Sequence, residues 1–183
     1  MKKSFLGYTT AFLFLLSACS DPSNDQQGKH EAHNHAAKED KTENSLSKEI
    51  QINDAQLDAI YVQYLILTEA LVDNDLKKAK IAANTIEAGA ASLKNGASIK
   101  FSTAKITDAT TINDGREAYS VLSNELVSMI KKTGMKNGEI FVGYCPMARD
   151  NQGGYWLSNN KSIQNPYYGE SMLTCGEVKE TIL

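Results

Sequence analysis

The sequence predicts a mostly α-helical protein: an antiparallel three- or four-helix bundle followed by a small C-terminal β-hairpin module. Three observations predict this class. Apolar residues recur at spacings of three and four through most of residues 54–133, and the connections between these segments are short. After Gly138 the apolar period changes from 3.6 to 2. Residues 50–183 are enough for one domain with its own core.

The first two helices are predicted from clear amphipathic stripes. Residues 54–74 are expected to form the first helix, capped by Asn53 or Asp54. Residues 75–93 are expected to form the second helix, which runs antiparallel to the first because the connection at residues 73–75 is short. The stripe of the first helix consists of Leu57, Ile60, Tyr61, Tyr64, Leu65, Thr68 and Leu71.

The second half of the bundle has a weaker pattern. Residues 98–111 favour only a short helix at about residues 103–109. Residues 116–133 are expected to form a long helix that begins after a cap at Asp114 and ends at Gly134. The helices carry no histidine that could serve as a general base, and we therefore expect a binding protein rather than an enzyme. The tyrosines at Tyr61, Tyr64 and Tyr119 are expected to pack in the core.

The C-terminal segment has the pattern of a β-hairpin. Residues 139–145 and 155–158 contain β-favouring residues, and the Gly-rich run at residues 150–154 predicts a turn between them. An isolated hairpin is marginally stable, and this one is expected to pack against the helices.

The first residues resemble a lipoprotein signal peptide. Residues 1–18 contain Lys2, Lys3 and a short apolar run, and Leu16-Ser17-Ala18-Cys19 resembles the lipobox, which implies lipidation of Cys19 and a membrane anchor. The alternative is an ordinary secretory signal cut after Ala18. We expect a periplasm-facing protein of the cell envelope, and Ser20 favours the outer membrane.

Residues 19–49 are polar and charged and predict a disordered tether. This tether contains all three histidines, His30, His33 and His35, which could capture a metal weakly or could be ordinary linker residues. Removal of the two signal lysines changes the formal net charge from −3 to −5. A mildly acidic chain without a basic stripe is a poor match for nucleic acid.

The remaining two cysteines and two nearby methionines indicate a soft-metal site. Cys145 and Met147 share one face of an extended strand, and Met172 and Cys175 share one side of a helical turn. Thiolates and thioethers suit Cu(I), with Ag(I) as the alternative, whereas zinc prefers thiolate and imidazole. From the residues alone, a structural disulfide between the cysteines stays open as the alternative. A thiol-redox enzyme is disfavoured because the chain has no Cys-x-x-Cys pair.

Two runs of residues carry a resemblance to a known family. The first is Tyr144-Cys145-Pro146-Met147, Tyr155-Trp156-Leu157-Ser158 and Asn165-Pro166-Tyr167-Tyr168-Gly169 through Met172-Leu173-Thr174-Cys175-Gly176; the second is Arg116-x-Ala118-Tyr119-x-x-Leu122-Ser123. They resemble a domain of unknown function found in exported bacterial proteins and at the C-terminus of periplasmic adaptor subunits of heavy-metal efflux pumps.

The resemblance implies copper or related heavy-metal handling, with efflux-pump components as partners, and supports Cys145, Met147, Met172 and Cys175 as the metal site. The chain lacks the other domains of an adaptor, so we expect a stand-alone metal-binding lipoprotein for metal handling, efflux or resistance. The alternative is a disulfide-stapled envelope interaction domain associated with an efflux complex, without bound metal.

Overall fold

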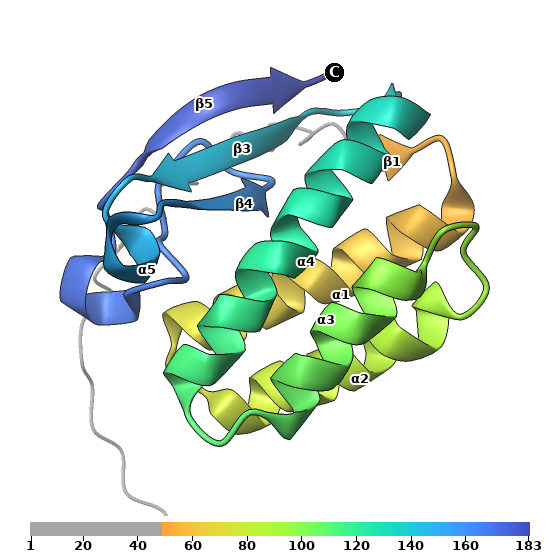
Figure 1. The fold of residues 1–183 in the computed structure, drawn as a ribbon. Coiled ribbons are helices and arrows are strands. Elements are labelled where there is room, and N and C mark those ends of the chain that lie inside the picture. Colours follow the sequence, from red (N-terminus) through yellow and green to blue (C-terminus); the bar gives the residue numbers. More distant parts are fainter. Residues whose placement is uncertain (1–48) are drawn as a thin grey trace, which may run out of the picture. The chain divides into compact units, whose positions relative to one another are not determined.

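The computed structural model describes residues 49–183. Four main helices form an antiparallel bundle in which each packs against the next along the chain, and a small antiparallel sheet follows (Figure 1). The predicted fold class is therefore confirmed. The main helices are α1 (Ala55–Val72), α2 (Leu76–Ala90), α3 (Ala97–Asp108) and α4 (Ile112–Thr133).

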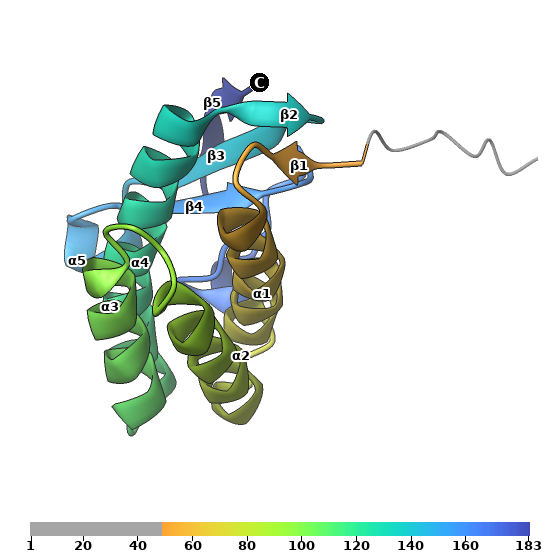
Figure 2. The same ribbon diagram turned by 90° about the vertical axis from the view of Figure 1, so that its right-hand side faces the viewer.

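The sheet packs against only half of the bundle. Helices α1 and α4 contact its strand β4 (Gly154–Ser158), whereas α2 and α3 lie on the far side of the bundle (Figures 1 and 2). The strand order is β4-β3-β5, with β3 (Ile140–Cys145) in the centre and β5 (Glu177–Ile182) at the edge. A separate two-stranded sheet pairs β1 (Gln51–Ile52) with β2 (Met135–Asn137).

Local signals explain where the helices begin and end. Asp54 caps α1 as predicted, because its carboxylate accepts the backbone N–H groups of Gln56 and Leu57. The predicted cap of α4 at Asp114 was wrong by one turn. Thr111 is the N-cap, and Asp114 is the third helical residue of a capping box, in which the Asp114 carboxylate accepts the backbone N–H of Thr111. Gly134 ends α4 with a positive φ of 79°.

The prediction for the third helix was wrong in length. A short helix at about residues 103–109 was expected, but α3 begins at Ala97 and runs for 12 residues. Its buried face alternates Ile99 and Ile106 with Ser102 and Thr103, whose hydroxyls bond to carbonyls of the preceding turn. Because these hydroxyls are satisfied within the helix, α3 can bury polar residues that weaken an apolar stripe.

The predicted hairpin is confirmed, and its strands pair in one register without a bulge. Strands β3 and β4 pair antiparallel from Phe141 opposite Ser158 to Cys145 opposite Gly154. Strand β5 was not predicted, because five of its six residues are exposed and it has no apolar period. It is held by pairing with β3 and by an exposed ion pair of 2.9 Å between Glu180 and Lys131 of α4.

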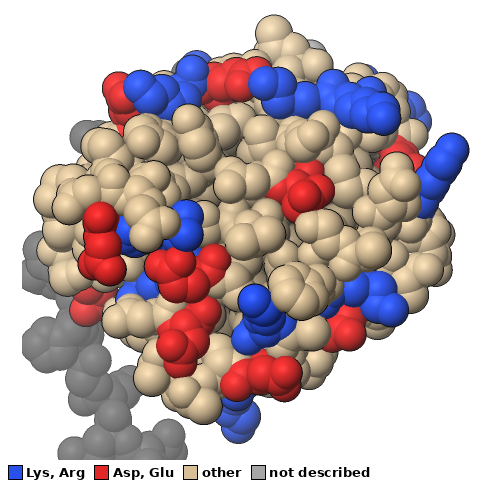
Figure 3. All heavy atoms as spheres, viewed as in Figure 1, with Lys and Arg blue, Asp and Glu red and all other residues tan. Residues whose placement is uncertain are grey.

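The described residues contain no helix that is long and apolar enough to cross a membrane. On the face shown in Figure 3, acidic and basic side chains lie among uncharged ones.

Candidate metal centre

The two cysteines of the domain lie in direct contact. Cys145 is the last residue of β3, and Cys175 lies two residues before β5. Their Sγ atoms are 3.0 Å apart, and one thiol donates a hydrogen bond to the other. The cysteines of the Cys-x-Met and Met-x-x-Cys units are therefore in contact, although they are 30 residues apart in sequence.

The backbone holds the two cysteines at this distance. Antiparallel pairing places Tyr144 of β3 opposite Glu177 of β5, so the chain just before β5 must pass beside the end of β3. Asn165 also holds the segment that ends at Cys175 by two hydrogen bonds. Its side-chain amide donates to the Cys175 carbonyl at 2.7 Å, and its backbone N–H donates to the Leu173 carbonyl at 2.8 Å. The side chain of Asn165 is buried, which restricts both bonds to one geometry.

The two thiols differ in their surroundings. Cys145 is 0 % exposed, whereas Cys175 is half-buried. The hydrogen bond from the thiol pair raises the pKa of Cys175, because it favours the protonated sulfur, and desolvation and the neighbouring sulfur act in the same direction. Because this pKa is raised, a metal ion that binds the Cys175 sulfur must displace its proton.

Met172 shares a turn with Cys175, but the prediction that Met147 shares an extended strand with Cys145 was wrong. Strand β3 ends at Cys145, and Met147 has helical backbone angles (φ −84°, ψ −11°). Met147 follows Cys145 by two residues and is 46 % exposed, and Met172 ends the 3₁₀ helix η1 (Gly169–Met172) and is half-buried. The backbone carbonyl of Met172 accepts the N–H of Cys175 at 3.0 Å. The Tyr168 hydroxyl donates to the carbonyl of Met147 and joins the two turns. The sulfur contact that the structure records is the one between the cysteines.

The residues beside the cysteines form an aromatic wall. The indole of Trp156 is buried and lies across Gly143 and next to Gly176, the residue that follows Cys175. A Cβ atom at Gly143 would lie 2.3 Å from the Trp156 ring, so this close approach requires glycine. The ring of Tyr167 meets Trp156 edge-on at 6.3 Å, and its hydroxyl donates to the carbonyl of Tyr155.

Arg116 holds the segment that leads to Cys175. The sequence marks this arginine as part of the resemblance but does not indicate that it is buried. Its guanidinium is buried and donates to the carbonyls of Pro166 and Leu71 and to the side chain of Asn74 at 2.8–3.0 Å. Desolvation lowers the pKa of Arg116, yet arginine remains charged at any ordinary pH. The Leu71 carbonyl is at the C-terminal end of α1, where the helix dipole favours a cation.

A buried hydroxyl network attaches the hairpin to the bundle. The Tyr64 hydroxyl accepts the backbone N–H of Leu157 at 3.1 Å and also bonds to the hydroxyls of Tyr119 and Ser123 at 2.7 and 2.8 Å. The prediction that Tyr61, Tyr64 and Tyr119 are core residues is thus confirmed, and two of them have a polar function as well. No sequence pattern distinguishes a tyrosine that joins such a network from one that only packs.

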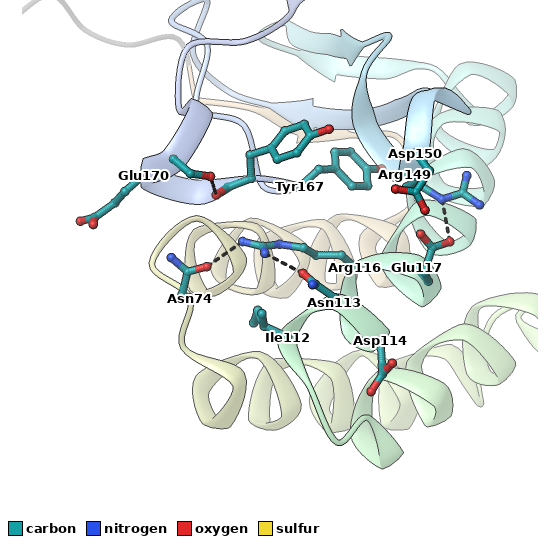
Figure 4. A pocket seen from close by; sticks show the side chains of 12 residues that line it. Asn74, Ile112, Asn113, Asp114, Arg116, Glu117, Arg149, Asp150, Tyr167 and Glu170 are labelled. Atoms are coloured by element: carbon teal, nitrogen blue, oxygen red, sulfur yellow. Dashed lines mark hydrogen bonds and ion pairs between the residues drawn. The ribbon is translucent and has the colours of Figure 1, made fainter.

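A cleft of about 830 Å³ has Arg116, Arg149 and Tyr167 in its lining (Figure 4). Tyr168, whose hydroxyl bonds to the Met147 carbonyl, also lines it. Across the cleft, Arg149 pairs with Glu117 at 2.8 Å and donates to Ser120 at 3.0 Å. Arg149, Asp150 and Asn151 have φ values of 55°, 54° and 67°, a run of left-handed residues in the short helical turn α5 (Ala148–Asn151). Such a run costs about 1–2 kcal/mol per residue, which the contacts of Arg149 help to offset.

Other predicted site residues lie outside the part of the chain that the structure describes: Cys19, His30, His33 and His35. Within residues 49–183, no group of three or more His, Cys, Asp and Glu side chains is placed to hold a metal ion. A site here would therefore depend on the two cysteines and on methionine sulfur.

Fold and site together define a small helical bundle whose C-terminal sheet carries a paired dithiol. Residues 60–138 match the model of a family described as "Protein of unknown function (DUF3347)", which is the kind of domain that the resemblance predicted. The match runs from α1 to the residues before β3 and ends short of the Cys/Met segment. Comparisons with curated proteins and with solved structures returned no match.

Proposed function

We propose that this protein binds Cu(I), or a related soft ion such as Ag(I), through Cys145 and Cys175, with Met147 and Met172 as additional sulfur ligands. The observation that carries the proposal is the 3.0 Å separation of the two cysteine sulfurs. A metal–thiolate bond is about 2.3 Å long, so two sulfurs this close can reach one ion after a small outward movement.

The surrounding residues support a soft monovalent ion. The described residues contain no histidine, because all three precede residue 49, and the acidic side chains form no cluster with the thiols. Thiolate and thioether ligands without imidazole or carboxylate favour Cu(I) over zinc. Cys175 is half-buried and Met147 is exposed, so two of the proposed ligands are accessible to solvent, as hand-over requires.

The proposed cellular role rests on the resemblance of the N-terminal segment to a lipoprotein signal peptide. We propose a lipid-anchored envelope protein that captures metal and passes it on for efflux or resistance, with efflux-pump components as candidate partners. Lipidation at Cys19 predicts that the protein incorporates a labelled fatty acid and that Cys19→Ser abolishes this incorporation. The histidines His30, His33 and His35 are proposed as weak additional metal ligands.

The test is an anaerobic Cu(I) titration of the reduced full-length chain carrying Cys19→Ser, in competition with a chromogenic Cu(I) chelator. We expect one tightly bound equivalent. Cys145→Ser and Cys175→Ser should abolish it, and Met172→Leu should weaken it roughly tenfold, about 1.4 kcal/mol. Met129→Leu, a partly buried methionine of α4, is the matched control and should bind as the parent does. Equal binding by the parent and both cysteine variants would refute the site.

Affinity should also rise with pH. The raised pKa of Cys175 means that binding releases protons over the whole neutral range. An affinity for Cu(I) that does not change between pH 6 and 8 would contradict binding through thiolates.

A second function rests on the same contact. The sulfurs are close enough to form a disulfide, and a disulfide-stapled interaction domain without metal would then result. Thiol counting on protein isolated from the periplasm without reductant distinguishes the two functions. If no free thiols are counted before reduction and the reduced protein does not bind Cu(I), the disulfide-stapled interaction domain is favoured.

A further inference from the structure

The cysteine pair is placed for a reaction as well as for binding. The Sγ atoms are 3.0 Å apart, and a disulfide bond is about 2.05 Å long, so bond formation requires a movement of roughly 1 Å. The flanking segments are held by the pairing of Tyr144 with Glu177 and by the side chain of Asn165. The two sulfurs therefore meet without any rearrangement of the sheet, as in an intramolecular reaction with a high effective concentration.

The two sulfurs also differ in access. Cys145 is fully buried, whereas Cys175 is half-buried and partly accessible to solvent. An oxidising ion would contact Cys175 first, and Cys145 would then supply the second sulfur from within the core. This combination of an accessible and a buried thiol suits a reaction that ends inside one chain, because the buried sulfur is protected from thiols of other chains.

We propose that Cys145 and Cys175 together reduce Cu(II) to Cu(I). Two Cu(II) ions each accept one electron, both S–H bonds break, one S–S bond forms between Cys145 and Cys175, and two protons pass to solvent. The choice of copper rests on the proposed function. The disulfide has no thiolate with which to hold the product, so the reaction supplies Cu(I) and at the same time closes the site. A dithiol reductant reopens it.

The experiment uses the reduced full-length chain with Cys19→Ser, so that Cys145 and Cys175 are the only thiols. Cu(II) is added anaerobically in the presence of excess chromogenic Cu(I) chelator, and Cu(I) and free thiols are both counted. We expect two Cu(I) ions per chain, loss of both thiols, and a monomer whose mass is lower by two hydrogens. Treatment with a dithiol should restore both thiols.

Two variants make the mechanism specific. Cys145→Ser leaves one accessible thiol, and it should yield at most one Cu(I) per chain, more slowly, with disulfide-linked dimers. Met129→Leu is the control and should react as the parent does. Free thiols that persist after Cu(II) is added, or parent protein that forms dimers as Cys145→Ser does, would overturn the proposal.

The outcome is separate from that of the Cu(I) titration. Reduction of Cu(II) with intramolecular disulfide formation, but no tight Cu(I) binding, would refute the proposed function and leave this reaction standing. Tight Cu(I) binding with no reduction of Cu(II) would refute this reaction and leave the proposed function standing.

Discussion

Replacement of Gly143 by alanine tests the packing that positions the cysteine pair. The added Cβ would lie 2.3, 2.5 and 2.7 Å from three atoms of the Trp156 ring, where real Cβ contacts are essentially never below 3.0 Å. The ring cannot withdraw easily, because it is 1 % exposed and also lies against Gly176. Either the indole or strand β3 must move, and we expect a loss of about 3 kcal/mol, at the upper end of the usual cost of overpacking.

Gly115→Ala is the matched control. It is the same substitution at a buried glycine, but the new Cβ would be 3.9 Å from its nearest neighbours, Ala109 and Leu76, which is an ordinary contact. Gly115 lies inside α4, where alanine is favoured over glycine. We therefore expect a gain of roughly 0.5–1 kcal/mol, with the opposite sign to Gly143→Ala.

Urea unfolding measures both effects, with circular dichroism for the helices and the fluorescence of the single tryptophan for the sheet. The midpoint should fall for Gly143→Ala and rise for Gly115→Ala while the slope m stays constant. Because Gly143 precedes Cys145 by two residues in β3, Gly143→Ala should also weaken Cu(I) binding. Parent-like stability of Gly143→Ala would refute the close packing of Trp156 on β3.

Three further predictions concern the interior. Arg116→Met should cost about 3–5 kcal/mol in urea unfolding, because it leaves several buried acceptors without a donor; a loss below 1 kcal/mol would show that the anchor is dispensable. Tyr64→Phe should lower the free energy of unfolding by about 1–3 kcal/mol, because the N–H of Leu157 loses its acceptor. Tyr61→Phe should be neutral or stabilising, because the Tyr61 hydroxyl is the one buried side-chain polar atom without a partner among the described residues. Equal losses for the two variants would contradict the hydroxyl network. Burial raises the pKa values of Tyr64 and Tyr119 above their ordinary value of 10.0. Their contribution to stability is therefore complete below pH 10 and is lost as the pH rises further. A urea midpoint that is unchanged from pH 9 to pH 11.5 would be inconsistent with this burial.

The sequence by itself determined the elements whose signals are local. Apolar residues three and four apart produced α1, α2 and α4, because a helix brings such residues to one face whatever it packs against. The cap at Asp54 and the stop at Gly134 also depend only on neighbouring backbone groups. The turn before β4 was visible for the same reason, since Gly153 adopts the positive φ of 81° that this turn requires.

Only the tertiary structure decided the features that depend on distant partners. Strand β5 has no pattern of its own and is ordered by pairing with β3, more than 30 residues earlier. The same pairing brings Cys145 and Cys175 into contact, so two separate motifs become one site. The anchor at Arg116 depends likewise on carbonyl groups from two other segments. These contacts form because folding buries apolar surface and pairs polar groups over the whole chain at once. A short stretch of sequence does not show which distant residues will become partners.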